Sequence, residues 1–283
     1  MKHVLFIVAL CFAAGTVMAQ GPVNTDPDKY KSSTSGYDSE LECEELAAHF
    51  DIDPVVARRV VPPSYALQLT PSGKAVGVWA AMHCSKLLLS GVDIAPTSFI
   101  HFWIAIEGPS EVIPVPGAVR TLPTSYLYSV EDQVTNDALH RAGRSAGHNY
   151  RKIKSLQLSS RDGNHRTGQV VEEAGRGYSW TETMALVPEK PLGGVNLRFW
   201  HMLRDSENVS DHPVGKGRVM CLVSLLGRNG SVTVQADPGT PFDKYFGQTS
   251  LTSNLLANFS PSKCKGTYGR GELAWDSYPP LPF

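Results

Sequence analysis

Two histidines lie in apolar segments of the chain that also carry tryptophan. Alternate positions of residues 74–84 are Ala75, Gly77, Trp79, Ala81 and His83, and those of residues 97–106 are Phe99, His101, Trp103 and Ala105. The remaining positions are mostly apolar as well, so neither predicted strand has a polar face. Small residues leave space, and aromatic rings with polar atoms line the pockets of apolar ligands. These faces therefore predict a cavity that binds an apolar small molecule.

Donors in such a cavity would support chemistry without a cofactor. The predicted catalytic residues are His83, His101 and Tyr126, which can transfer protons or polarise a carbonyl group. The predicted ligand-binding residues are Trp79, Trp103, Tyr128 and Trp180 as walls, with Arg198 holding a ligand oxygen. Arg198 has a structural alternative, an ion pair with Glu182 on a neighbouring strand. A second packed layer would also bury the same aromatic residues without any ligand.

Other kinds of site lack a signature in this sequence. There is no G-x-S-x-G motif and no cysteine or histidine spacing typical of a metal site, so we predict neither a metal nor a cofactor. The formal net charge of −1 gives no basic surface for nucleic acid. Hydrophobic residues make up 42% of the chain and charged residues 19%, which is typical of a globular protein.

The first 19 residues have the pattern of a secretory signal peptide. A short basic start, Met1–His3, precedes an apolar run, Val4–Val17, and a small-residue cleavage site follows. Residues 20–37 are polar and proline-containing, so we predict a disordered spacer. Residues 38–283 form the predicted single domain. Since no second long apolar segment follows, we expect a secreted protein without stable membrane insertion.

The cysteines and the glycosylation signals are interpreted in this oxidising compartment. Four cysteines follow the leader, and they allow three disulfide pairings. Pairing between neighbouring regions of the chain favours Cys43–Cys84 and Cys221–Cys264. Asn208 and Asn229 each begin an Asn-x-Ser tripeptide in a predicted turn, so both are expected glycosylation sites in a eukaryotic host.

Helices are predicted in two parts of the domain. Residues 38–50 place apolar side chains beside a run of glutamates with helical spacing, and a short second helix should run from Pro54 to about Val60. Further along, Ser129-Val-Glu-Asp132 resembles a capping box, which would begin an inserted helix that ends near Gly143.

Most of the remaining domain consists of short segments with period-two alternation. The predicted strands are residues 64–70, 74–89, 97–106, 124–129, 150–159, 168–173, 178–187, 195–203, 218–226 and 231–236. Asp162-Gly163 and Asn229-Gly230 have the composition of hairpin turns. Many short strands must protect their edges, which favours a mainly β fold: a curved antiparallel sheet or β-barrel with a short N-terminal helical segment and one inserted helix.

One block of the sequence resembles a known family. Residues 76–84, residues 99–104 and Gly108-Pro109, preceded by Val61-Pro-Pro-Ser-Tyr65, resemble the curved β-barrel of acetoacetate-decarboxylase-like proteins. That resemblance implies a lysine that forms a Schiff base in a hydrophobic pocket. Lys152 and Lys154 lie in the corresponding part of the chain, but their alternating pattern is typical of a solvated strand.

The overall character of the chain resembles a second group. A leader, sequons, four cysteines and an aromatic pocket are similar to secreted fungal cyclisation enzymes of natural-product pathways, of the hetero-Diels–Alderase type. The resemblance implies a cofactor-free enzyme that promotes a cyclisation or a (hetero-)Diels–Alder-type cycloaddition of apolar terpenoid or polyketide substrates. The alternatives are a secreted binding protein without catalysis, a decarboxylase-like lyase, and an interaction protein with surface tryptophans. The oligomeric state stays open.

Overall fold

The computed structural model describes residues 36–63, 65–108, 112–114, 121–159, 164–201, 215–253 and 255–270. The strands are β1 (Gly36–Ile52), β2 (Ala75–Leu89), β3 (Val92–Asp93), β4 (Thr97–Ala105), β5 (Val112–Pro114), β6 (Thr121–Val134), β7 (Tyr150–Leu158), β8 (His165–Glu172), β9 (Gly177–His201), β10 (Gly215–Ala236), β11 (Ser250–Ser253) and β12 (Leu255–Arg270). The helices of this part are α2 (Pro54–Arg58), α3 (Asp137–Ser145) and α4 (Pro241–Phe246). The predicted leader, most of the predicted spacer and the sequon at Asn208 lie outside the described residues.

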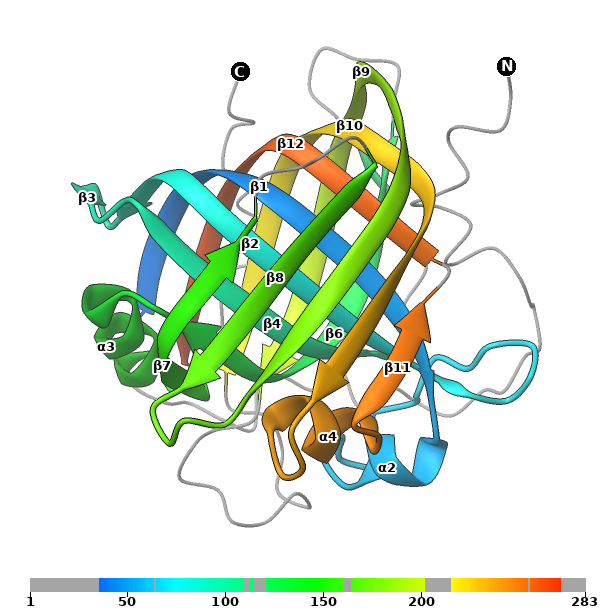
Figure 1. Cartoon of the computed structure of the whole chain (residues 1–283). Coiled ribbons are helices and arrows are strands. Elements are labelled where there is room, and N and C mark those ends of the chain that lie inside the picture. Colours follow the sequence, from blue (N-terminus) through cyan, green and yellow to red (C-terminus); the bar gives the residue numbers. More distant parts are fainter. Residues whose placement is uncertain are drawn as a thin grey trace.

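The strands form one large, strongly curved mixed sheet (Figure 1), so the predicted mainly β fold is confirmed. Pairing is antiparallel except that β6 runs parallel to β7 and to β9. β1 pairs with β12 on one side and with β2 on the other. From β1 the pairings lead through β12, β10, β9, β6, β4 and β2 back to β1.

Two apolar cores lie on the opposite faces of β1, β2, β4 and β6. The first, here called the α4-side core, includes Trp79, Phe102 and the aromatic residues of α4. The second, here called the disulfide-side core, includes Trp103, Phe99 and all four cysteines. Because both faces are packed, these strands lack the polar side that a one-layer sheet would have.

The predicted helix over residues 38–50 is wrong, because this segment belongs to β1. Its buried and less buried residues alternate, but the alternation changes phase near Cys43, where the register shifts on both sides of the strand. That irregularity gives the sequence a spacing close to helical. Pairing with two strands outweighs the helical propensity of the glutamates.

The two other helical predictions hold in part. α2 follows Asp53, whose side chain accepts a hydrogen bond from the backbone N–H of Val55 at 2.8 Å. The inserted helix exists as α3, but it begins after Asn136 rather than in the Ser129–Asp132 segment. There β6 continues to Val134, so the predicted capping box is wrong.

Both favoured disulfides are present. Cys43–Cys84 joins β1 to β2, and Cys221–Cys264 joins β10 to β12. In each pair the two cysteines face each other directly in the strand register. Each disulfide therefore fixes the alignment of two strands that hydrogen bonds already pair.

Several strand predictions are confirmed. Residues 97–106 and 150–159 correspond closely to β4 and β7. Others were too short, since residues 178–187 and 195–203 belong to one strand, β9, and residues 218–226 and 231–236 belong to β10. The predicted strand over residues 64–70 is wrong, because only isolated bridges form among its described residues.

The predicted turn at Asn229-Gly230 is wrong, because β10 runs through it with only a register shift between Arg228 and Ser231. Residues 160–163, including the predicted Asp162-Gly163 turn, lie outside the described part. Among the described residues no helix is both long and apolar enough to cross a membrane.

Candidate functional site

The strand register separates the residues that the sequence placed on one surface. His101 of β4 faces Ala80 of β2, whereas Trp79 faces Phe102. His101 and Trp103 therefore lie on the disulfide side, and Trp79 lies on the α4 side. The prediction of a shared surface is wrong, since an odd-numbered residue of β2 always faces an even-numbered residue of β4.

On the disulfide side, His101 contacts a carboxylate. Nδ1 of His101 contacts Oδ1 of Asp132 on β6, and the side chains are only 13% and 6% exposed. The hydroxyl of Ser129 donates to Oδ2 of Asp132 at 3.4 Å. Trp103 stacks on the imidazole with ring centroids 4.3 Å apart, and Phe99 packs edge-on against it at 5.0 Å.

This arrangement suits proton transfer. A carboxylate that accepts the Nδ1 proton fixes the tautomer of the imidazole and leaves Nε2 as a base. The carboxylate also stabilises the imidazolium that forms after His101 takes a proton. The sequence indicated His101 but not Asp132, because Ser129–Asp132 looked like the start of a helix.

A second histidine, His49, lies on the same side and was not predicted. His49 of β1 faces Val78 of β2, which in turn faces Trp103 of β4. Burial lowers the pKa of His49 to about 4, so its imidazole is neutral at neutral pH. The sequence did not indicate His49, because a helical conformation of residues 38–50 would not place it in this row. The neighbouring row contains Ala47, Ala80 and His101, so two small side chains precede the imidazole in that row.

The other predicted donors lie apart from His101. His83 is exposed, and its Nδ1 lies 2.8 Å from the hydroxyl of Ser98. Tyr126 and Tyr128 belong to the α4-side core. Burial and nearby Tyr65 raise the pKa of Tyr128 far above its usual range, so it acts only as a neutral phenol.

Three of the four predicted aromatic walls, Trp79, Tyr128 and Trp180, lie on the α4 side, whereas Trp103 lies on the disulfide side. Trp79 and Trp180 meet edge to face with centroids 4.9 Å apart. Trp200, which is not among the predicted site residues, stacks on Tyr126, with the ring centroids 6.2 Å apart and the rings nearly parallel. Arg198 is buried and faces Tyr126 across the parallel pairing of β6 and β9. Arg198 and Glu182 share β9, so they do not come from neighbouring strands as the alternative assumed.

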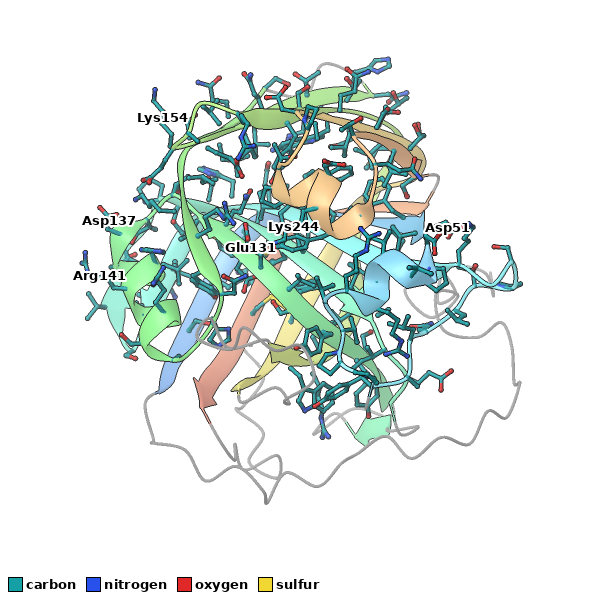
Figure 2. The ribbon with its side chains drawn as sticks, turned by 90° about the horizontal axis from the view of Figure 1, so that it is seen from below. Asp51, Glu131, Asp137, Arg141, Lys154 and Lys244 are labelled. Carbon is teal, nitrogen blue, oxygen red and sulfur yellow. A yellow bond between two sulfur atoms is a disulfide. The ribbon has the colours of Figure 1, made fainter. Side chains whose placement is uncertain are left out.

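A buried carboxylate that was not predicted occupies the α4 side of β6. Glu131 is 1% exposed and accepts two contacts from Arg151, at 2.9 and 3.0 Å. The Tyr245 hydroxyl of α4 donates to it at 2.8 Å. Burial raises the pKa of Glu131, and Arg151 and these hydrogen bonds act in the opposite direction. Figure 2 shows Glu131 beside α4, so this carboxylate helps to anchor the helix.

The same network continues through Gln133. Its amide nitrogen donates to Glu131 at 3.3 Å and to Glu172 at 3.2 Å, and its oxygen accepts from Tyr178 at 2.7 Å. All four residues are buried. Two carboxylates are thus linked through one amide in an apolar surrounding, where each hydrogen bond matters more than it would in water.

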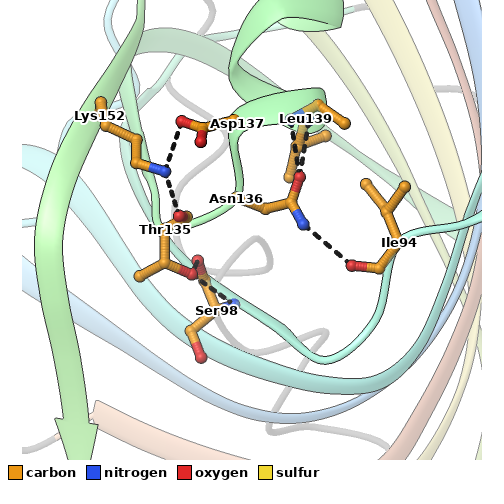
Figure 3. Close-up of polar contacts among 8 residues, drawn as sticks. Ile94, Ser98, Thr135, Asn136, Asp137, Leu139 and Lys152 are labelled. Atoms are coloured by element: carbon orange, nitrogen blue, oxygen red, sulfur yellow. Dashed lines mark hydrogen bonds and ion pairs between the residues drawn. The ribbon is translucent and has the colours of Figure 1, made fainter.

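A lysine suited to Schiff-base chemistry is not found among the described side chains. Lys154 lies on the outer surface (Figure 2). Lys152 is part-buried, and its ammonium donates to the backbone oxygen of Thr135 and to Asp137 (Figure 3). The other lysines with described side chains are exposed: Lys74, Lys86, Lys244 and Lys263. In the same part of the chain no group of three histidine, cysteine or acidic residues could hold a metal ion.

Solved structures with a similar fold are acetoacetate decarboxylases and a related protein. A structure of the decarboxylase from Legionella pneumophila has a TM-score of 0.52 and 11% identity, over 90% of this chain and 96% of that one. A second acetoacetate decarboxylase has a TM-score of 0.53 and 11% identity, over 88% and 93% of the two chains.

An acetoacetate-decarboxylase-like enzyme from Sphingomonas wittichii RW1 gives a TM-score of 0.50 at 11% identity, over 92% of this chain and 98% of that one. No protein-family model and no curated protein matches the chain. The expected fold resemblance is confirmed, and identity this low shows the fold alone. The resemblance to hetero-Diels–Alderases stays a prediction.

Proposed function

We propose that this chain is a secreted, cofactor-free enzyme for an apolar small molecule, with His101 as its general acid–base. The observation that carries the proposal is the contact between His101 and the buried Asp132. An aspartate that orients an imidazole is a recurrent arrangement in proton transfer. Trp103 and Phe99 give the imidazole an apolar surrounding that suits an apolar substrate.

The proposed reaction begins with proton transfer beside a carbonyl group or with loss of water. Nε2 of His101 takes the proton, and Asp132 stabilises the resulting imidazolium. The imidazolium then returns the proton either to the leaving hydroxyl group, which departs as water, or to the carbonyl oxygen of the substrate. Holding both reacting parts in place can then supply roughly 7–11 kcal/mol of the barrier to a cyclisation or cycloaddition. Tyr126 lies on the opposite face of the sheet, so Ser129 is the better second hydroxyl in this mechanism.

The fold favours one alternative, a lyase related to acetoacetate decarboxylase. Schiff-base catalysis requires a lysine with a depressed pKa in an apolar site. The described lysine side chains are exposed or part-buried at the surface, which argues against that chemistry among the described residues. A lyase on this fold would therefore use His101 and Asp132 for proton transfer.

The experiment compares His101→Ala and Asp132→Asn with His83→Ala, an exposed histidine as matched control. Each purified protein is incubated with acetoacetate and, separately, with an apolar extract of the producing cells, and products are followed by mass spectrometry. We expect the wild type and His83→Ala to convert a component of the apolar extract. The rate of this conversion should fall at least a hundredfold in His101→Ala and in Asp132→Asn. Undiminished turnover by His101→Ala would refute the proposed role. Retention of an extract component without turnover by any protein would identify a binding protein instead.

Secretion is part of the proposal and has its own test. Two disulfides are compatible with an oxidising compartment. Expression of the full chain in a eukaryotic host, followed by N-terminal sequencing of the medium fraction, should give a mature chain that begins at Gln20. Protein retained in the cell with Met1 intact would contradict a cleaved leader. Loss of mass on deglycosylation would support use of Asn208 or Asn229.

A further inference from the structure

His49 lies on the same face of the sheet as His101, although the proposed reaction gives it no part. It alternates with Ala47 along β1, and Ala47 packs against the disulfide-side core. That core takes residues from β1, β2, β4, β6, β10 and β12. Strands far apart in the sheet therefore meet on this side, so the face that carries both histidines is the concave one.

The strand register fixes how far apart the two histidines lie. His49 faces Val78 and His101 faces Ala80, so the histidines are two strands and two residues apart. With strands about 4.8 Å apart and a rise of about 3.3 Å per residue, their Cα atoms would be roughly 12 Å apart in a flat sheet. Both imidazoles extend from a concave face, so the rings are closer together than the backbones. At this separation one small molecule can contact both rings.

Solvent reaches both imidazoles. His49 is partly exposed, and the side chain of His101 is 13% exposed. Exposure on this face of β1 increases with distance from the disulfide, since Cys43 is buried, His49 is partly exposed and Asp51 is exposed. This gradient places the open end of the face at Asp51.

The hydrogen-bonding groups of the His49 imidazole are not used within the described part of the chain. Burial lowers the pKa of His49 to about 4, so at neutral pH its imidazole is uncharged and carries one N–H. That N–H is therefore available to an oxygen of a bound molecule.

The charges on this face disfavour anionic ligands. The Asp132 carboxylate contacts His101, and the Asp51 carboxylate lies at the open end. Among the described side chains that β1, β2, β4 and β6 place on this face there is no lysine or arginine. A carboxylate ligand would meet two like charges without a described cation to offset them, so the face favours an uncharged ligand.

We propose that His49 binds the oxygen of an uncharged carbonyl substrate whose neighbouring carbon gives its proton to His101. The proposal rests on the proposed role of His101 and names the substrate class of that site. As the C–H bond breaks, its electron pair forms a C=C bond and negative charge develops on the carbonyl oxygen. The N–H of His49 donates to that oxygen, and His101 then returns the proton to it, which leaves a neutral enol.

Binding is tested by NMR on the purified protein with ¹⁵N-labelled histidine, at neutral pH. His49→Gln and His101→Ala assign the two imidazoles by the loss of their signals. The probes are acetone and acetate, which have the same number of heavy atoms, although only acetate is an anion. We expect acetone to shift the signals of both imidazoles along one saturation curve, while acetate and the exposed control His83 show no such response. An unmoved His49 signal, or an equal response to acetate, would overturn the proposal.

Proton transfer is tested by the exchange of the acetone hydrogens for deuterium in heavy water, which requires the enol. Loss of one donor to a developing oxyanion costs about a hundredfold to a thousandfold in rate, so His49→Phe should slow the exchange about a hundredfold. His49→Gln keeps an N–H donor and should retain more of the rate. His83→Phe is the matched control and should exchange acetone as fast as the wild type.

The outcomes separate this proposal from the proposed function. Exchange that is lost in His101→Ala but undiminished in His49→Phe would overturn the role of His49 alone. Equally slow exchange by His49→Phe and His49→Gln would show that the shape of the imidazole matters rather than its N–H, and would also overturn it. No exchange by the wild type would overturn the proposed substrate class, while conversion of the extract would still decide the role of His101. The titration of the wild type with acetone decides binding even if His49→Phe fails to fold.

Discussion

Replacement of His49 by glutamine should remove part of the loss of stability that acid causes. His49 is only partly exposed, and burial lowers its pKa from a usual value of 6.5 to about 4. The unfolded chain therefore binds a proton at this histidine in a pH range where the folded protein does not. Because the unfolded state binds more protons, the free energy of unfolding falls as the pH drops from 6.5 toward 4.

The lowered pKa of His49 corresponds to a loss in the free energy of unfolding of at most about 3 kcal/mol. This full loss is reached when the pH lies below both the unfolded and the folded pKa. The imidazole keeps part of its surface in contact with solvent, so we expect about 1–2 kcal/mol in practice. Glutamine has similar polarity but takes up no proton in this range. The wild type should therefore lose about 1–2 kcal/mol more stability than His49→Gln between about pH 7 and pH 4.

Urea unfolding without reductant, followed by tryptophan fluorescence at a series of pH values, measures the difference. His83→Gln is the control, because the side chain of His83 is exposed. The free energy of unfolding of His83→Gln, plotted against pH, should run parallel to that of the wild type. A His49→Gln curve that also parallels the wild type from pH 7 to about pH 4 would refute the argument that burial holds His49 neutral.

Three further substitutions test the packing around the candidate sites. Tyr245→Phe removes a donor to the buried Glu131 carboxylate and should lower the free energy of unfolding by about 1–3 kcal/mol, measured in urea; no change would mean that α4 is held by its apolar contacts alone. Gly168→Ala should lower the free energy of unfolding by about 1–3 kcal/mol, because the new Cβ would lie 2.1 Å from the Trp180 ring. It should also shift the maximum of the tryptophan fluorescence, and an unshifted spectrum would contradict this packing. Asn136→Ala removes the side chain that accepts from the backbone N–H groups of Ala138 and Leu139 and donates to the backbone oxygen of Ile94 (Figure 3). Thermal melting followed by circular dichroism should show that the free energy of unfolding falls by about 0.5–2 kcal/mol. An unchanged melting midpoint would mean that these hydrogen bonds contribute nothing to stability.

The sequence predicted those elements whose local pattern agrees with their packing. β4 is apolar along most of its length, and Asp53-Pro54 determines the start of α2 locally. The pattern of β1 predicts a helix, because the register shifts near Cys43 interrupt the alternation. Its true conformation depends on pairing with β2 and β12, which local spacing does not specify.

The site was predictable in its residue types more than in its geometry. His101 was identified from its apolar neighbours, but its partner Asp132 looked like part of a helix cap. The face that each strand presents depends on the register between strands, and one residue of shift moves every side chain to the other face. For that reason Trp79 and Trp103 were assigned to one surface, although the sheet separates them.

The two adjacent carboxylates of β6 connect both cores through a single strand. Glu131 anchors α4 on one face, and Asp132 orients His101 on the other. A one-residue insertion or deletion upstream in β6 would exchange these carboxylates and disrupt both arrangements at once. Sequence divergence in this protein should therefore proceed by substitution along β6, whereas length changes should accumulate in the connections between strands.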